Sequence, residues 1–243
     1  MTLDDLRGKH TGKCAIILGA GPSLQFADER ICKDRISIAL NDAIIKFPNS
    51  DYYLTMDPTM VDRRHWPVVL GGSFPCILKK DAWDGHGGYA HMVGKGKDLS
   101  EDRTVLVEWK PDDMTSRSYK VSRDDQAFIV GGSSAHSAVN FAVILGCETI
   151  YLVGCDCRLD DDGRRYFWQY EGQQQFIGGM VYQDPAFLYG YREPNQDDEL
   201  VKYVGAGWRE LRNLNPGITI VDASGGVLSE VFLTATIDEL QNG

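Results

Sequence analysis

The chain has 243 residues, of which 43% are hydrophobic, 10% aromatic and 25% charged, and this composition excludes disorder, collagen-like repeats and coiled coils. Thirty-five acidic residues against 25 basic ones leave a net charge of −10, so we expect no broad nucleic-acid surface and no attraction to anionic lipids. The longest apolar segments have about seven residues, far fewer than a membrane helix needs. No basic stretch followed by an apolar run occurs at Met1–Asp5, which predicts a cytoplasmic protein without a signal peptide.

Seven short runs rich in apolar and β-branched residues predict buried strands. In chain order they are Cys14–Leu18, Ile36–Leu40, Tyr52–Met56, Cys76–Leu78, Thr104–Val107, Thr149–Val153 and Ile218–Val221. Before the sixth run, the segment from Ser134 to Leu145 repeats apolar residues at helical spacing, and Gly146 follows where a helix would end. Strands alternating with helical or polar stretches predict an α/β fold, with a Rossmann-like, mostly parallel sheet and helices on both faces.

Two long segments fit neither strands nor helices of this pattern. Residues 81–103 are rich in Gly, His, Lys and Asp, and residues 158–198 are polar and aromatic. Long loops in compact domains are often lids or binding loops, so we expect lid-like active-site insertions here. No linker or repeat divides the chain, which predicts a single domain over residues 1–243.

A glycine-rich turn, Gly19-Ala20-Gly21-Pro22-Ser23, follows the first predicted strand. Its glycines permit close approach of a ligand, and Pro22 and Ser23 suit the first turn of a helix whose free N–H groups favour an anion. Phosphates bind at this position in parallel sheets. A dinucleotide fingerprint is incomplete, because Leu24 replaces its third glycine, and no Walker lysine follows. The alternative is a tight strand–helix turn without a ligand.

A second glycine turn, Gly131-Gly132-Ser133-Ser134, precedes the predicted helix. Ser133 or Ser134 is expected to cap the helix, whose free amides and dipole make a second anion cradle. Two such helix starts facing each other would hold one nucleotide. His136, in the first helical turn, is expected either to contact phosphate or to be solvated.

Two acidic residues, Asp57 and Asp156, stand where parallel strands are expected to end. Side chains at this edge of a sheet can bind ribose hydroxyls, a divalent cation such as Mg²⁺ or an acceptor. The alternative is that each caps a turn. Cys155 and Cys157 flank Asp156, but no further zinc ligands are evident, so we expect them, like the other four cysteines, to be free thiols.

Four segments together resemble one known family. They are Ile16–Leu24, Ile38–Ile44 with Asp51–Asp57, Gly131–Ser134 continuing through Gly146–Asp156, and Gly217–Leu228. Their order and spacing resemble the 6-hydroxymethylpterin diphosphokinase MptE-like family, which is related in fold to bacterial sialyltransferases that use a CMP-sugar donor. The resemblance implies a Rossmann-like domain with a nucleotide between the two glycine turns. The site residues it implies are Gly19, Gly21, Pro22, Ser23, Asn41, Asp57, Gly132, Ser133 and Asp156.

The chain departs from this family at one position. Related sequences tend to carry a histidine shortly after the strand that ends at Asp156, and in the sialyltransferase-like members it acts as general base. No histidine occurs in Leu159–Trp168 here. We expect Arg164 or Arg165 to stabilise a departing phosphate instead, and Tyr166 to position the acceptor.

These observations predict a nucleotide-dependent transferase. A glycosyltransferase with a nucleotide-sugar donor and a carbohydrate or small alcohol acceptor is preferred, because the aromatic segment 166–191 suits stacking on a sugar. One alternative is a diphosphokinase that moves diphosphate from ATP to a pterin-like alcohol, with Mg²⁺ held by Asp57 and Asp156. Another is a nucleotide- or glycan-binding module without activity. A homo-oligomer remains open.

Overall fold

The computed structural model describes residues 1–57, 60, 63–80, 98–110, 119–129, 133–158, 166–169, 175–177, 180–182 and 206–243. Most of the predicted insertions, including residues 81–97 and 183–198, lie outside the described residues. The strands are β1 (Cys14–Leu18), β2 (Arg35–Leu40), β3 (Tyr52–Thr55), β4 (Cys76–Lys79), β5 (Thr104–Val107), β6 (Thr149–Val153), β7 (Gln175–Ile177), β8 (Met180–Tyr182), β9 (Thr219–Asp222) and β10 (Leu233–Thr234).

The described helices are of two kinds, α-helices and short 3-10 turns. The α-helices are α1 (Ala43–Lys46), α2 (Trp66–Gly71), α4 (Ser134–Ile144), a helix over residues 206–214, and α7 (Ile237–Asn242). The 3-10 turns are Asp4–Leu6, Pro22–Phe26, Glu29–Cys32, Glu101–Arg103, Phe167–Gln169 and Val227–Glu230. None of the helices in the described ranges has the length and hydrophobicity that crossing a bilayer requires.

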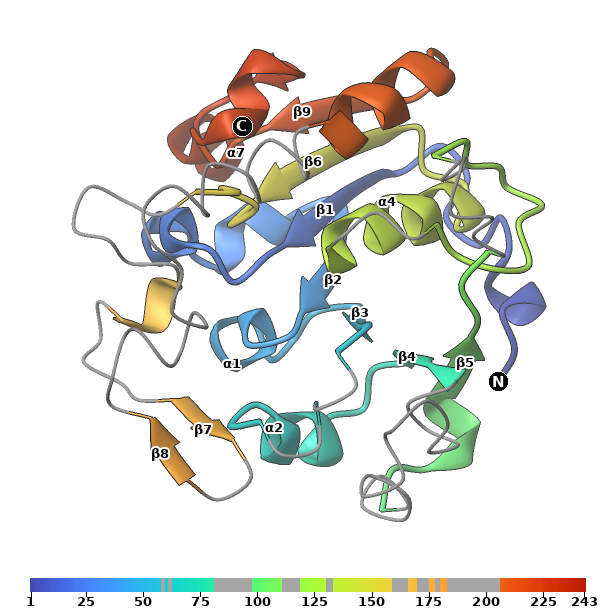
Figure 1. Cartoon of the computed structure of the whole chain (residues 1–243), viewed down its shortest axis with the longest axis vertical. Coiled ribbons are helices and arrows are strands. Elements are labelled where there is room, and N and C mark those ends of the chain that lie inside the picture. Colours follow the sequence, from blue (N-terminus) through green and yellow to red (C-terminus); the bar gives the residue numbers. More distant parts are fainter. Residues whose placement is uncertain are drawn as a thin grey trace.

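The main sheet has eight strands in the order β10-β9-β6-β1-β2-β3-β4-β5, and all of its pairings are parallel. Figure 1 shows β9, β6, β1, β2, β3, β4 and β5 following one another across the molecule. The chain moves from β1 outward to β5 and then returns to the other side of β1 as β6. The strand order therefore reverses between β1 and β6, the place where ligands bind in sheets of this class.

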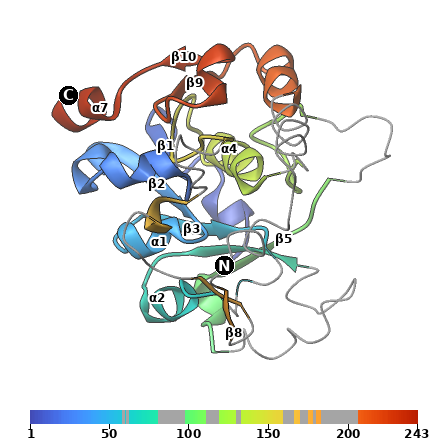
Figure 2. The ribbon, with the colours of Figure 1, turned by 60° about the vertical axis from the view of Figure 1, so that its left-hand side comes forward.

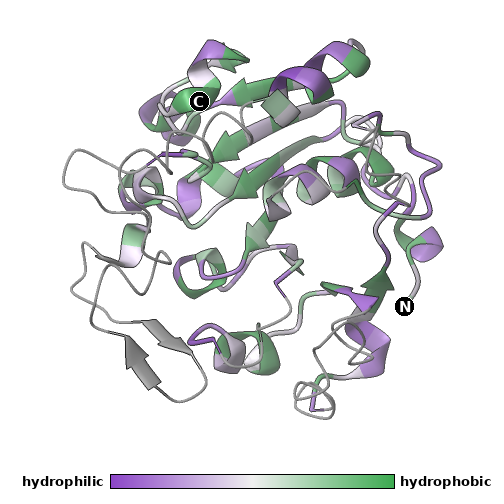
Figure 3. Ribbon diagram, in the orientation of Figure 1, coloured by the Kyte–Doolittle hydropathy of each residue, from purple (hydrophilic) through white to green (hydrophobic). Residues whose placement is uncertain are grey.

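Two apolar layers cover the two faces of this sheet. Alternate residues of β1 divide between them, with Ala15 and Ile17 in one cluster and Ile16 and Leu18 in the other. The first cluster includes the apolar residues of α4, and the second those of α1, α2 and α7. Figure 2 shows α4 on the opposite side of the strands from α1, and in Figure 3 the central strands are hydrophobic along most of their length. The predicted Rossmann-like α/β fold is confirmed.

Helix α4 lies almost entirely inside the protein. It ends at Ile144, and Gly146 follows with φ +94°, the left-handed conformation that glycine adopts most easily. Two polar residues of this helix, Asn140 and His136, are 0% exposed. Because α4 is buried on more than its apolar side, the polar groups of its first turns must find partners within the protein or in a ligand.

Candidate functional site

The glycines after β1 bring the loops that follow β1 and β6 into direct contact. The backbone N–H of Gly19 donates to Val153 O at 2.7 Å, and that of Gly21 donates to Gly154 O at 2.8 Å. A Cβ atom at Gly19 would collide with the Gly154 carbonyl, and one at Gly21 with the Asp156 carboxylate. Both glycines are therefore required by the neighbouring loop.

The carboxylate of Asp156 lies against the start of the Pro22–Phe26 turn. Ser23 donates its backbone N–H to Oδ1 at 3.1 Å and its hydroxyl to Oδ2 at 3.0 Å, while Ser23 Oγ accepts from Gly154 N at 3.1 Å. Asp156 is 6% exposed. Burial raises its pKa to about 6, although the hydrogen bonds from Ser23 favour the charged form.

The expected anion cradle at this turn differs from the structure in two respects. Pro22–Phe26 is a single 3-10 turn, too short for an appreciable helix dipole. The amides of Gly19, Gly21 and Ser23 already have protein acceptors, and Pro22 has no amide hydrogen. The carboxylate of Asp156 therefore accepts from the Ser23 N–H, one of the groups that was expected to bind a phosphate.

A second group of polar residues joins the ends of β2 and β3. The Thr55 hydroxyl donates to Asn41 Oδ1 at 2.6 Å and accepts from Asp57 N at 3.0 Å. Asn41 has φ +50°, a left-handed conformation that asparagine tolerates better than most residues. Because Asn41 Oδ1 accepts from Thr55, the group with which Asn41 can bind a ligand is its Nδ2 amide, a hydrogen-bond donor.

The N-terminus of α4 is connected to the same edge of the sheet. Met56, directly after β3, donates its N–H to Ser134 Oγ at 3.4 Å. Ser133 occupies the N-cap position, but its side chain makes no capping hydrogen bond. Its Oγ instead lies 2.9 Å from Nδ1 of His136. The Ser133 side chain therefore accepts no hydrogen bond from the first amides of this 11-residue helix, which lie near the ends of β2 and β3.

The two acids expected to hold Mg²⁺ have other partners. Asp57 Oδ2 forms an ion pair with Arg63 at 3.1 Å, and both carboxylate oxygens of Asp156 accept from Ser23. In the described part of the chain, no three His, Cys, Asp or Glu side chains converge in a way that could hold a metal ion. These contacts do not fit a resident Mg²⁺ site, so we assign no step to a metal.

A buried hydrogen-bonded triad was missed by the sequence interpretation. The Tyr53 hydroxyl lies 2.9 Å from His65 Nε2, and His65 Nδ1 lies 2.7 Å from Asp42 Oδ1. All three residues are at most 3% exposed. Burial opposes the charge of Asp42, but the hydrogen bond and charge of His65 and the charge of Arg64 hold its pKa below the ordinary value. No local spacing in the sequence links these residues.

Tyr166 stacks on Trp168 with ring centroids 5.2 Å apart, and the Arg64 guanidinium lies 4.7 Å from the Trp168 ring. Arg64 Nε is also 3.7 Å from Asp42 Oδ2, which connects this stack to the buried triad. The expected contribution of Tyr166 to a binding surface remains a prediction. Arg164, Arg165 and Gly132 lie outside the described residues.

The six cysteines are free thiols. Burial raises the pKa of Cys157 to about 12 and that of Cys155 well above its ordinary value. The solvated alternative for His136 is wrong, because this side chain is 0% exposed.

No protein-family model matches the sequence, and no curated protein matches it. Two solved structures are similar to it. One is the sialyltransferase CstII from Campylobacter jejuni in complex with the substrate analogue CMP-3FNeuAc, at 12% identity and a TM-score of 0.43, covering 92% of this chain and 86% of that chain. The other is CST-II with a trisaccharide acceptor and CMP, at 14% identity and a TM-score of 0.44, covering 95% of this chain and 88% of that chain. At these values the similarity assigns neither a substrate nor a catalytic residue.

Proposed function

We propose that the chain is a glycosyltransferase that uses a nucleotide-sugar donor. The observation that carries the proposal is the chain of contacts Asn41–Thr55–Asp57 and Met56–Ser134, which joins the ends of β2 and β3 to the N-terminus of α4. It places an amide, a carboxylate and the amides of a helix start at one edge of a parallel sheet, where nucleotides bind in this class of fold.

The proposed roles follow from the chemistry of these groups. Ser133, Ser134 and the first amides of α4 bind the donor phosphates, and Asn41 Nδ2 binds the ribose or a phosphate oxygen. Asp57, oriented by Arg63, accepts from sugar hydroxyls. Asp156 and Ser23 hold the loops after β6 and β1 together beside this site. Arg164, Arg165 and Tyr166 stay proposed contacts of the leaving group and the acceptor.

The test is titration calorimetry with CMP, CDP, UDP, GDP and ATP, each with and without Mg²⁺, followed by assays of nucleotide release from the matching sugar donors. Asn41→Asp keeps the acceptor for Thr55 and the left-handed backbone but removes the amide donor, so we expect it to lose about tenfold or more in affinity. Asn213→Asp, on the exposed side of the helix over 206–214, is the matched control and should bind as the wild type does.

Each arm separates the proposal from its alternatives. Binding of CMP, CDP, UDP or GDP with release from a sugar donor supports a glycosyltransferase. Binding of ATP only with Mg²⁺, with AMP release, would support the MptE-like diphosphokinase instead. Binding without turnover would leave a nucleotide-binding module, and no binding at all would contradict the proposal.

A further inference from the structure

His136 is a buried histidine whose two ring nitrogens have different surroundings. Its Nδ1 lies 2.9 Å from Oγ of Ser133, which is the N-cap residue of α4. Its Nε2 is buried and has no hydrogen-bond partner among the described residues. The residue is 0% exposed, and burial lowers its pKa to about 3. The ring is therefore neutral at physiological pH and carries a single N–H.

The ring is held between aromatic residues from two other segments. It stacks on Trp208, of the helix over 206–214, with centroids 3.9 Å apart and planes at 24°, and the Tyr119 ring lies 5.8 Å away. Trp208 in turn packs edge-on against Phe232. Rotation of the imidazole away from Ser133 would require these rings to move.

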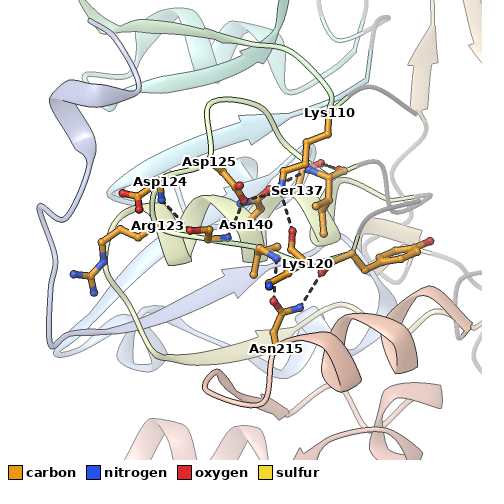
Figure 4. A network of polar contacts seen from close by, with 12 residues as sticks. Lys110, Lys120, Arg123, Asp124, Asp125, Ser137, Asn140 and Asn215 are labelled. Atoms are coloured by element: carbon orange, nitrogen blue, oxygen red, sulfur yellow. Dashed lines mark hydrogen bonds and ion pairs between the residues drawn. The ribbon is translucent and has the colours of Figure 1, made fainter. Parts of the chain in front are cut away.

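A polar network keeps Tyr119 in place. Asn215 accepts from Val121 N at 2.9 Å and donates to Tyr119 O at 2.8 Å. Asn140 of α4 donates to Asp125 Oδ2 at 2.8 Å. Figure 4 shows segment 119–129 running between the α4 residues and Asn215. The segment is thus fixed to α4 on one side and to Asn215 on the other.

The tautomer of His136 decides what Ser133 offers to a ligand. If the proton is on Nδ1, the ring donates to Ser133 Oγ, and the serine hydroxyl proton is left to donate elsewhere. If the proton is on Nε2, Ser133 must donate to Nδ1, and a buried N–H has no acceptor. Orphaned buried N–H groups are rarer than under-satisfied acceptors, so the first tautomer is favoured.

We propose that His136, protonated on Nδ1, is a positioning residue that turns the Ser133 hydroxyl into a hydrogen-bond donor for a phosphate at the N-terminus of α4. The inference rests on the proposed nucleotide site and adds to it the group that orients its phosphate-binding serine. It also explains why a helix N-cap serine bonds to a histidine rather than to the helix amides. The ligand class is any phosphate or diphosphate of a nucleotide donor.

The test compares phosphate-containing and phosphate-free ligands. His136→Phe keeps a ring to stack on Trp208 but removes Nδ1, whereas His136→Asn places an amide donor near the position of Nδ1. The matched control is His10→Phe, because His10 Nε2 also makes one hydrogen bond, to the Tyr52 hydroxyl at 2.8 Å. His10 precedes β1 and therefore lies near the start of this strand, away from the strand ends that carry the proposed site. Dissociation constants are measured for CMP, UDP, GDP and pyrophosphate, and for cytidine, uridine and guanosine.

We expect His136→Phe to weaken binding of the phosphate-containing ligands about tenfold and to leave nucleoside binding within about twofold, since one hydrogen bond to a charged group is lost. His136→Asn should recover most of this loss, and His10→Phe should bind as the wild type does. ¹⁵N spectra of the wild type should show a protonated Nδ1 and a bare Nε2 in His136.

Three results would contradict this inference but not the proposed function. His136→Phe could keep the wild-type preference for phosphate-containing ligands, or the Phe and Asn variants could lose the same affinity for them. The third result is a ¹⁵N spectrum that shows the proton of His136 on Nε2. A merely structural role would weaken nucleoside and nucleotide binding together. If the wild type itself binds phosphate-containing ligands no better than nucleosides, both the inference and the phosphate site of the proposed function are wrong.

Discussion

Ser23 donates both its backbone N–H and its hydroxyl to the carboxylate of Asp156, at 3.1 and 3.0 Å, although the two residues belong to different strand–loop units. The contact closes the sheet edge between β1 and β6. Burial makes the Asp156 carboxyl group difficult to ionise and raises its pKa to about 6. The pH dependence of stability therefore reports on this contact.

We expect Asp156→Asn to remove a pH-dependent part of the stability. The folded protein holds the Asp156 proton more tightly than the unfolded chain, where the pKa is near 3.8. This contribution is complete below about pH 4 and is lost as the pH rises through about 6, with a total on the order of 3 kcal/mol. We therefore measure the free energy of unfolding of both proteins in urea from pH 4 to 7. The value of the variant minus that of the wild type should increase as the pH rises. A constant difference would contradict the raised pKa.

Gly19→Ala should destabilise the protein by at least about 2 kcal/mol, because its Cβ would collide with the backbone carbonyl of Gly154. Gly71→Ala is the matched control at the end of α2, where a Cβ meets no atom within 4 Å. That substitution should leave the stability unchanged or raise it by about 0.5 kcal/mol. Denaturant midpoints of the two variants measure the difference, and equal midpoints would show that the β1 and β6 loops can separate easily.

Asp42→Ala should cost about 3–5 kcal/mol, because it leaves His65 Nδ1 and the nearby Arg64 without their buried carboxylate. Glu230→Ala removes the carboxylate of the exposed Arg209 pair and should have no measurable effect on the unfolding midpoint. Tyr53→Phe, which removes only the hydroxyl bonded to His65, should cost about 1 kcal/mol. A loss in Asp42→Ala no larger than in Tyr53→Phe would contradict the importance of the carboxylate.

Asn215→Ala should destabilise the protein by about 2 kcal/mol or more, because Val121 N and the carbonyls of Tyr119 and Leu211 lose buried partners. Asn213→Ala, at an exposed position two residues earlier, is the control. Thermal unfolding followed by near-ultraviolet circular dichroism would also detect a change around Trp208. Identical curves for both variants would show that water replaces the Asn215 contacts without cost.

The strands could be predicted from the sequence because their residues are apolar on both faces. The predicted bounds of β1, β5 and β6 agree with the structure, and Gly146 ends α4 as expected. Strands that are buried on both faces have few polar residues, so such runs stand out in a sequence of average composition. Edge elements, such as the two-residue β10, carry no comparable signal.

The partners of the site residues could not be predicted in the same way. A glycine that admits a ligand and a glycine that admits a neighbouring loop look identical in sequence, and only the packing of Gly19 and Gly21 distinguishes them. Similarly, the Tyr53–His65–Asp42 triad depends on how the start of α2 packs against β3 and the start of α1. Contacts between residues distant in the chain are set by tertiary packing, for which local spacing contains no information.

The central position of β1 also affects how the protein reaches its fold during synthesis. Cys14 pairs with Arg35 on one side, which leaves the ribosome soon afterwards, and with Thr149 on the other, which is made much later. Until β6 is made, β1 has no strand to pair with on that side, so its backbone edge stays open. The nascent chain must be kept from pairing with other copies during this interval, so a holding chaperone should increase the yield of folded protein, whereas slower translation before Thr149 should decrease it.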